Sequence, residues 1–344
     1  MKIPSSEDNN NFTLLRNLLA LAVVFGHFKL LSGTPAPAFP FNLADAAVDS
    51  FFVVSGYLIT GSYERTRGLA PFYLRRLFRL YPLYACAVLV QTVVMMLLLP
   101  GGPFSAPHST LRYLGFNLFF MNFAQYDIGG VLSGLPNPGI NPSLWTLKIE
   151  IGFYLIVPVI CAAVRQWRGW VLAAIFVASV AYDLVLSHLG HEVAAKQLPG
   201  QMQFFVVGMG LWMYGRQLRV HPGIAWAVCF AFLACWTFLS PIPAGVRPCV
   251  VGAFVYCFAV CLPASRLQFD MSYDIYLVHG PLIQTLLVLG LFSDSLAGLT
   301  GVVVAVLMIA CVAERFVERP GNEFGRTLSA RVGRRPARVV SSVA

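Results

Sequence analysis

The sequence predicts an all-α membrane protein, a polytopic bundle of about ten transmembrane helices with both termini in the cytoplasm. Hydrophobic residues make up 58% of the 344 residues and charged residues only 11%, whereas soluble domains have roughly 45–50% and 25%. The mean hydropathy is +0.71. So few charged side chains cannot cover a surface that faces water, which excludes an ordinary soluble enzyme and a disordered chain.

Charge and cysteine usage exclude two further classes. The net charge is +9, but the basic residues are not collected on one soluble face, so no nucleic-acid partner is expected. The eight cysteines all fall in apolar stretches and form no CxxC pair. This is typical of cysteines that act as small buried hydrophobes.

Ten segments come near the roughly 20 apolar residues that a helix needs to cross the hydrocarbon core of a bilayer. The first begins at Leu14 and has no small-residue cleavage site after it, so we expect a retained span rather than a signal peptide. The ten predicted spans are 13–31, 44–62, 80–99, 144–164, 170–187, 201–215, 223–240, 248–263, 272–292 and 297–315.

The Lys and Arg residues between the spans set the orientation, because they gather on the cytoplasmic side. With the N-terminus inside and ten alternating spans, 18 of the 24 Lys and Arg residues fall inside, 4 outside and 2 within spans. A further span at the apolar stretch 111–126 would put the later basic loops outside. We therefore expect 111–126 to dip into the membrane from the outer side or to lie along the interface.

The chain divides into a membrane part, 1–319, and a basic tail, 320–344. The tail contains Gly, Ser and five Arg residues. We expect it to be mobile, cytoplasmic and in contact with anionic lipid.

Ionisable residues inside predicted spans indicate function, because they are costly in lipid. Three of them lie at a similar predicted depth below the outer ends of three spans: His27 about 7 Å, Asp49 about 8 Å and Glu150 about 10 Å down. Histidine titrates near neutrality and acts as a general base when a carboxylate fixes its tautomer. The alternative is that each residue only makes an interhelical polar contact. The matched depth favours a catalytic site built from these three side chains.

A second predicted group lies toward the cytoplasm. Arg75 and Arg79 are four residues apart and share a helical face, and Arg76 flanks it. Guanidinium groups bind phosphates bidentately, so a phosphate-bearing cofactor entering from the cytosol would fit. The alternative is a topology signal that contacts lipid phosphates. The other members of this predicted inner group are Arg16, Ser55, Tyr57 and His279.

The remaining motifs are weak. His188, His191 and Glu192 form an H-x-x-H-E pattern in a predicted outer loop, but no further ligand cluster lies nearby, so no metal site is expected. The sequence contains neither a GxSxG elbow nor a GxxxxGK[ST] loop.

Six segments, taken together, carry a resemblance to a known family. They are Arg16 with His27, Val48–Ile59, Phe72–Pro82, Ser143–Tyr154, Ser272–His279 and Glu318–Pro320. In this order they resemble the motifs of the acyltransferase-3 family, integral-membrane enzymes that acylate surface sugars, exopolysaccharides and some small molecules. The chain departs from the family pattern at Lys148, where a small or apolar residue is common, and at Ser50, where a Leu is usual.

The resemblance implies an O-acyltransferase that moves an acyl group, above all acetyl, from cytosolic acyl-CoA to a hydroxyl of a carbohydrate-type acceptor. Such acceptors are exopolysaccharide, lipopolysaccharide or glycolipid. Acyl-CoA is then a substrate, and no tightly bound cofactor is expected. The inner arginines would hold the nucleotide phosphates, and His27 would take the proton of the acceptor hydroxyl, with Glu150 or Asp49 orienting its ring. Acylation of His27 itself is the alternative.

The resemblance also implies a multi-pass protein of the bacterial plasma (inner) membrane. Two other classes stay open from the sequence. A transporter or flippase of a glycan or lipid-linked substrate would also carry midplane charges, although inverted repeats and broken helices would then be expected. A membrane-embedded interaction protein would need no matched histidine and carboxylates.

Overall fold

The computed structural model describes residues 10–333 apart from 67, 240, 241, 266, 268 and 292–295. All regular secondary structure in these residues is helical, because a segment that crosses lipid must satisfy its backbone hydrogen bonds internally. The chain ends, 1–9 and 334–344, lie outside the described residues, so the cytoplasmic side of both termini stays a prediction. The helices are α1 Phe12–Ser32, α2 Ala44–Arg65, α3 Leu69–Leu97, α4 Pro107–Asn117, η1 Pro142–Leu144, α5 Trp145–Trp167, α6 Trp170–His188, α7 Glu192–Ala195, α8 Leu198–Met213, η2 Gly215–Gln217, α9 Pro222–Phe238, α10 Arg247–Tyr256, η3 Cys257–Cys261, α11 Ser272–Val288, α12 Leu296–Ala313, η4 Glu314–Glu318 and α13 Arg319–Gly333.

Each of the ten predicted spans overlaps a helix of the structure, and two of them, 248–263 and 297–315, also extend over a π-helical segment. Five helical stretches are long and apolar enough to cross a membrane, and they comprise α1, α3, η1 with α5, α6, and α12 continued into α13. Helix α8 has 16 residues, or about 24 Å at 1.5 Å per residue, which falls short of the roughly 30 Å hydrocarbon core. The chain is thus a membrane helical bundle, and ten full crossings remain a prediction.

The stretch 111–126 does not form a span. Its helical part belongs to α4, which has 11 residues and is about 16 Å long. Buried polar contacts hold α4 against α3: the Gln91 amide donates to the Tyr113 hydroxyl at 2.7 Å, and the Tyr84 hydroxyl donates to the Asn117 carbonyl at 2.5 Å. Turns follow from Leu118. A short excursion in place of a crossing agrees with the charge argument.

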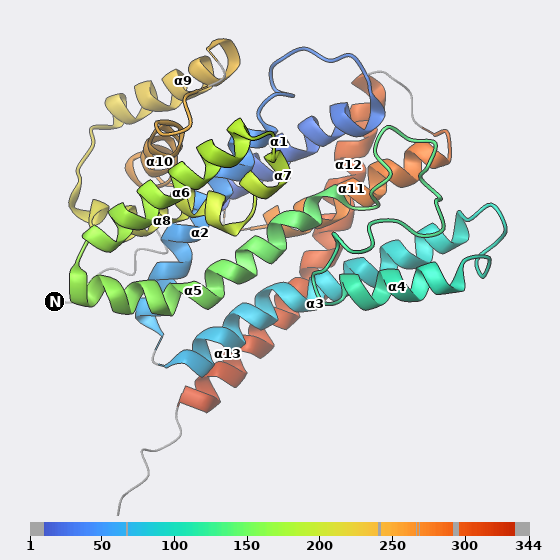
Figure 1. Ribbon diagram of the computed structural model, residues 1–344, viewed down its shortest axis with the longest axis horizontal. Helices are drawn as coiled ribbons and strands as arrows, with labels where there is room; N and C mark the ends of the chain where they lie inside the picture. Colours follow the sequence, from blue (N-terminus) through green and yellow to red (C-terminus); the bar gives the residue numbers. More distant parts are fainter. Residues whose placement is uncertain are drawn as a thin grey trace, which may run out of the picture.

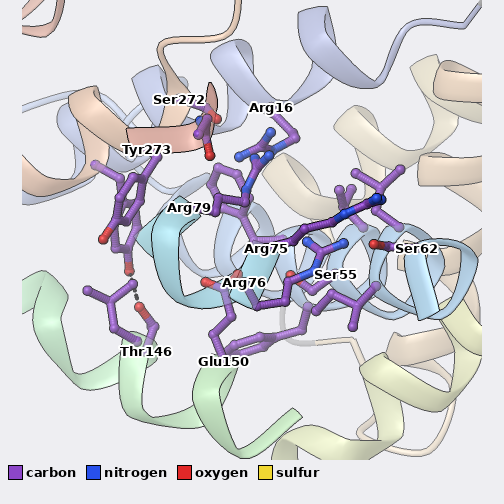
Figure 2. Close-up of a pocket in the computed structure, with 18 of the residues that line it drawn as sticks. Arg16, Ser55, Ser62, Arg75, Arg76, Arg79, Thr146, Glu150, Ser272 and Tyr273 are labelled. Atoms are coloured by element: carbon purple, nitrogen blue, oxygen red, sulfur yellow. Dashed lines mark hydrogen bonds between the residues drawn. The ribbon is translucent and has the colours of Figure 1, made fainter. Parts of the chain in front are cut away.

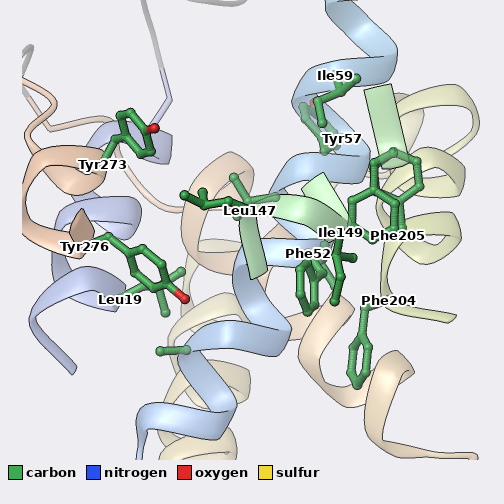
Figure 3. Packing of buried hydrophobic residues seen from close by; sticks show 14 of the residues in the cluster. Leu19, Phe52, Tyr57, Ile59, Leu147, Ile149, Phe204, Phe205, Tyr273 and Tyr276 are labelled. Atoms are coloured by element: carbon green, nitrogen blue, oxygen red, sulfur yellow. The ribbon is translucent and has the colours of Figure 1, made fainter. Parts of the chain in front are cut away.

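Helix α2 lies in the middle of the bundle, packed against α1 and α8 (Figure 1). Its contact with α8 is very close because glycines meet there: a Cβ on Gly56 would overlap the carbonyl oxygen of Phe205, and one on Gly208 would overlap the backbone of α2. Small residues at such crossings hold helices together in lipid. Phe52 and Phe205 belong to the buried cluster beside this contact (Figure 3). One face of α2 is thus packed against α8, while a different face, which includes Ser55, lines the cavity described below.

The C-terminal region is helical as far as residue 333, so residues 320–333 of the predicted tail form part of a helix. Helix α13 continues α12 through η4 and packs along α3 (Figure 1). A stripe of small residues at every fourth position, Gly321, Gly325 and Ser329, makes this possible. A Cβ on either glycine would press on Phe78 or Pro82 of α3, and Ser329 is buried. The remaining tail residues, 334–344, lie outside the described residues.

Candidate active site

A cavity of about 670 Å³ is lined by residues from α1, α2, α3, α5, α11 and α13. Glu150 is the one acidic residue among the described residues that line it, and the arginines point into it from several helices (Figure 2). The lining arginines are Arg16, Arg65, Arg75, Arg76, Arg79 and Arg326. Such a concentration of positive charge in a concave site attracts anions.

Asp270, in the loop before α11, compensates part of this charge. It forms an ion pair with Arg16, and Arg79 Nη2 lies 3.8 Å from the same carboxylate oxygen. Burial by itself raises the pKa of Asp270, but the two guanidinium groups and hydrogen bonds from Ser272 outweigh it and hold the pKa below its usual range. Asp270 is therefore ionised at neutral pH. Within the described residues, no carboxylate pairs in this way with Arg75 or Arg76.

Arg76 is held by aromatic rings. Its guanidinium carbon lies 5.8 Å from the centre of the Phe72 ring and 5.5 Å from that of Tyr154, whose hydroxyl donates a hydrogen bond to Glu150. These ring contacts help to orient the guanidinium group. The buried Nε of Arg76 has no hydrogen-bond partner among the described residues. A buried donor without a partner indicates room for an anionic ligand.

Ser55 and Tyr57, the two members of the predicted inner group on α2, face different surroundings in the structure. Ser55 lines the cavity together with the arginines (Figure 2). Tyr57 does not line it, because its ring packs between Phe12 at 4.8 Å and Trp212 at 5.2 Å between ring centres. The structure therefore does not place Tyr57 in this cavity, and a direct role of Tyr57 in binding a cofactor stays a prediction.

His27 and His279 form a hydrogen-bonded pair. His27 Nδ1 lies 2.7 Å from His279 Nε2, and His279 Nδ1 lies 2.9 Å from the carbonyl oxygen of Ile275. Because a carbonyl can only accept, His279 carries its proton on Nδ1, and its Nε2 must accept from His27 Nδ1. The neutral His27 is thereby fixed with a free lone pair on Nε2. This is the tautomer that a general base requires.

Ser143 and Asn141 support this pair. Ser143 Oγ lies 3.2 Å from His279 Nε2 and 3.4 Å from His27 Nδ1. Asn141 accepts from the Ser143 amide at 3.2 Å and donates to the Leu277 carbonyl at 2.9 Å. That carbonyl lacks its helical partner because residue 281 is a proline. Asn141 thus ties the start of α5 to α11 beside the histidines.

The histidine pair adjoins the arginine-lined cavity. Thr146 and Tyr276 line the cavity, and the Thr146 hydroxyl lies 2.8 Å from that of Tyr276. The ring of Tyr276 is 6.0 Å from that of His279, centre to centre. Ser143 of η1 and Glu150 of α5 are seven residues apart on one face of the continuous helical stretch Pro142–Trp167, and they are separated by about 10 Å. This face runs from the histidines to the arginines.

Neither predicted carboxylate partner contacts His27. Asp49 pairs with Arg247, whose Nε donates to it at 2.6 Å, and the Arg247 guanidinium carbon lies 5.0 Å from the ring centre of Trp236. Glu150 accepts from Tyr154 in the arginine cavity. The matched-depth argument failed because depth says nothing about which way a helix face is turned. Asp49 faces α10, and Glu150 lies about two turns beyond the histidine level along α5.

His279 also lies elsewhere than expected, since it contacts His27 rather than the arginines. The depth estimate took α11 to begin at the inner membrane edge. In the structure, Asn17 of α1 donates to the Phe269 carbonyl at 2.9 Å and accepts from the Met271 amide at 3.0 Å. These bonds start α11 more than one turn above the beginning of α1.

The sequence interpretation missed several residues of the site, among them Asn141, Ser143, Thr146, Asp270, Tyr276 and the cavity arginines Arg65 and Arg326. Ser143 and Tyr276 stood inside the motifs that carry the family resemblance, which was a usable signal. Asp270 is an acid directly before a predicted span, a signal for an ion pair with the inner arginines. Within the described residues, no group of three His, Cys, Asp or Glu side chains is arranged to hold a metal ion.

Comparison with known proteins gives a consistent picture. A family model described as an acyltransferase domain, of the acyltransferase-3 type, matches residues 9–315. Nodulation protein 10 of Rhizobium leguminosarum bv. viciae is 27% identical, covering 95% of this chain and 97% of its own length. The O-acetyl transferase of Shigella phage Sf6 is 28% identical over 90% of this chain and 97% of its own length. The exopolysaccharide production protein ExoZ of Rhizobium meliloti (strain 1021) is 28% identical over 83% of this chain and 92% of its own length. No solved structure matches.

Proposed function

Because the chain belongs to the acyltransferase-3 family of membrane acyltransferases, we propose that it transfers an acetyl group from cytosolic acetyl-CoA to a hydroxyl of a carbohydrate-type acceptor. The observation that carries the proposal is the His27–His279 pair directly beside a cavity lined by six arginines. The first supplies a base of fixed tautomer, and the second supplies phosphate-binding groups. In acyl transfer from a nucleotide-linked thioester, the base would activate the acceptor hydroxyl and the arginines would bind the donor.

The cavity suits the acyl donor. The diphosphate would bind Arg75 and Arg76, which form no ion pair with a carboxylate among the described residues, since guanidinium groups bind phosphate oxygens bidentately. Arg16 and Arg79 are already paired with Asp270. They would raise the positive electrostatic potential of the cavity without binding the diphosphate directly. The pantetheine arm would follow the face of α5 past Thr146 toward His27.

The chemical step uses the lone pair on His27 Nε2. It takes the proton from the acceptor hydroxyl while the oxygen attacks the thioester carbonyl. The tetrahedral intermediate then collapses, the carbon–sulfur bond breaks, and the CoA thiolate receives the proton from the His27 imidazolium. His279 keeps accepting from His27 Nδ1 throughout and so stabilises the imidazolium. In the alternative route, His27 Nε2 attacks the thioester first and carries the acetyl group to the hydroxyl.

The acceptor class is inferred from the relatives, two of which are named as an O-acetyl transferase and an exopolysaccharide production protein. His27 is half-buried and lies in the part of α1 next to the loop that follows it. A glycan hydroxyl would reach it from that side, opposite the arginines. The bacterial plasma membrane, where acetyl-CoA and nascent glycans meet, is the location that we propose.

A transfer assay with purified protein tests the proposal. Acetyl-CoA labelled in the acetyl group is incubated with the protein in lipid nanodiscs and with glycans from cells that lack the gene. We expect free CoA and labelled glycan to appear in equal amounts, with the label lost on mild alkaline treatment as an ester. A transporter or flippase would move its substrate and leave the thioester intact, and that result would refute the proposal.

A further inference from the structure

Helix α13 lies beyond the part of the chain that the family model matches, yet it forms a wall of the arginine-lined cavity. The match ends at residue 315, and α13 begins at Arg319. Asn322 and Arg326 of α13 line the cavity. They are four residues apart and so share one helical face.

The small-residue face of α13 fixes where these two side chains stand. Gly325 presses against Phe78 of α3, and Ser329 donates to the Pro71 carbonyl at 3.0 Å. The Ser329 oxygen also accepts from Arg75 Nε at 2.9 Å. Helix α13 therefore orients one of the cavity arginines in addition to contributing Arg326. The helix is part of the site rather than an appendage.

Arg326 is placed at the rim of the cavity. It is exposed, whereas Arg76 is largely enclosed between two rings and Arg16 is mostly buried. Among the described residues, no carboxylate forms an ion pair with Arg326. The amide of its neighbour Asn322 donates to Glu318 at 3.3 Å, which leaves the guanidinium group of Arg326 as the charged group that α13 presents to a ligand.

We propose that Arg326 binds the 3′-phosphate of the CoA ribose and makes the enzyme prefer CoA thioesters over donors that lack this phosphate. The inference rests on the proposed acyl-CoA donor. In a CoA thioester the 3′-phosphate lies at the end of the molecule opposite the thioester. With the thioester near His27 and the diphosphate at Arg75 and Arg76, the 3′-phosphate comes to the rim, where Arg326 stands. A guanidinium group is the side chain best suited to a phosphate dianion.

The test compares two acyl donors, acetyl-CoA and 3′-dephospho-acetyl-CoA, with protein in nanodiscs of phosphatidylcholine alone. We expect Arg326→Ala to raise the KM for acetyl-CoA about tenfold, the effect of losing one charged hydrogen-bonded contact. The KM for the dephospho donor should stay at the wild-type value for that donor. The matched control is Arg331→Ala, which removes an exposed arginine of the same helix that does not line the cavity. It should behave as wild type with both donors.

A binding measurement keeps the inference independent of turnover. Adenosine 3′,5′-bisphosphate should bind the wild type more tightly than it binds Arg326→Ala, while adenosine 5′-phosphate should not distinguish the two. Equal effects of Arg326→Ala on both acyl donors, or none on either, would overturn the inference. So would an effect that appears only when anionic lipid is added, since Arg326 would then be a lipid contact.

The same data separate this inference from the proposed function. If the wild type transfers acetyl from acetyl-CoA and Arg326→Ala does the same with an unchanged KM, only the role of Arg326 is refuted. If the wild type transfers acetyl from neither donor and does not bind the bisphosphate, the acyl-CoA proposal fails, and this inference fails with it.

Discussion

Asp270 forms an ion pair with Arg16 and thereby sets the level at which α11 begins along α1. From Arg16 to His27 the rise is about 16 Å, and from Asp270 to His279 it is about 13 Å, at 1.5 Å per residue. The two histidines consequently reach the same level, where they lie within hydrogen-bond distance. An ion pair at the arginine-lined cavity, together with the Asn17 hydrogen bonds, thus helps to set the geometry of the proposed catalytic base.

Replacing His27 with alanine is expected to abolish activity while the protein still folds and is expressed. Loss of a general base costs about 10²- to 10⁴-fold in rate, and the half-buried side chain leaves a tolerable space. The measurement is the initial rate of acetyl transfer, with protein quantity and monodispersity checked by immunoblot and gel filtration. His108→Ala, at an exposed position on α4, is the matched control. A wild-type rate in well-expressed His27→Ala protein would exclude both routes through His27.

His279 is expected to act by positioning His27. Without its Nε2 acceptor, the proton of His27 is free to move to the other nitrogen, so His279→Ala should lower kcat about 10- to 100-fold and leave the KM for acetyl-CoA unchanged. In His279→Gln the amide oxygen can replace the missing acceptor and should recover part of the rate. If the Ala and Gln variants are equally slow, His279 contributes packing alone.

Arg76 is expected to bind the acyl donor. Arg76→Ala should raise the KM for acetyl-CoA tenfold or more, and Arg76→Glu should raise it further because it reverses the charge. The acceptor KM should change little. Arg165→Ala, an exposed arginine of α5 outside the cavity, serves as the control. Should the combined Ala replacement of Arg75, Arg76 and Arg79 leave acetyl-CoA affinity unchanged, the cluster is only a topology signal.

Asp270 is expected to make stability depend on pH in the acidic range. Because its pKa is depressed in the folded protein, its contribution is fully present above the unfolded value of about 4 and is lost as the pH falls below it. Asp270→Asn should lower the unfolding free energy at pH 7 by roughly 2 kcal/mol, since it leaves Arg16 partnerless in a partly buried site. Thermal melts in detergent at pH 7 and pH 3 measure this. The difference between variant and wild type should shrink at pH 3, and a constant difference would contradict the assignment.

The orientation of the chain can be tested by cysteine labelling of intact cells. Ser133→Cys and Ser187→Cys, in a background without the exposed Cys249 and Cys311, should both react with an impermeant thiol reagent. Ala330→Cys should react only after permeabilisation. Position 330 is preferable to Ser329 because Ser329 is buried against α3. Labelling at position 133 but not at position 187 would show that the later half of the chain has the opposite orientation in the membrane.

The sequence predicted helices at all ten apolar segments. It also placed Arg75, Arg76 and Arg79 in one inner group, and five members of that group line one cavity in the structure. The helices and the grouping of these side chains are predictable because apolarity and the helical repeat act along the chain, whereas their role in binding a donor stays a prediction. The pairing of His27 with His279 was beyond reach, since it depends on the starting level of α11 and on how each helix is rotated. The docking of α13 was missed for a different reason: its basic composition concealed the repeat of Gly321, Gly325 and Ser329.

The atom that ends the hydrogen-bond chain of the two histidines is the main-chain oxygen of Ile275. Every amino acid supplies that oxygen, so no point mutation at position 275 can delete it. The hydrogen bond that places the proton of His279 on Nδ1 therefore does not depend on which amino acid stands at position 275. The side chains that carry this proton pattern are those of His27 and His279, and Ser143 lies within 3.4 Å of both rings.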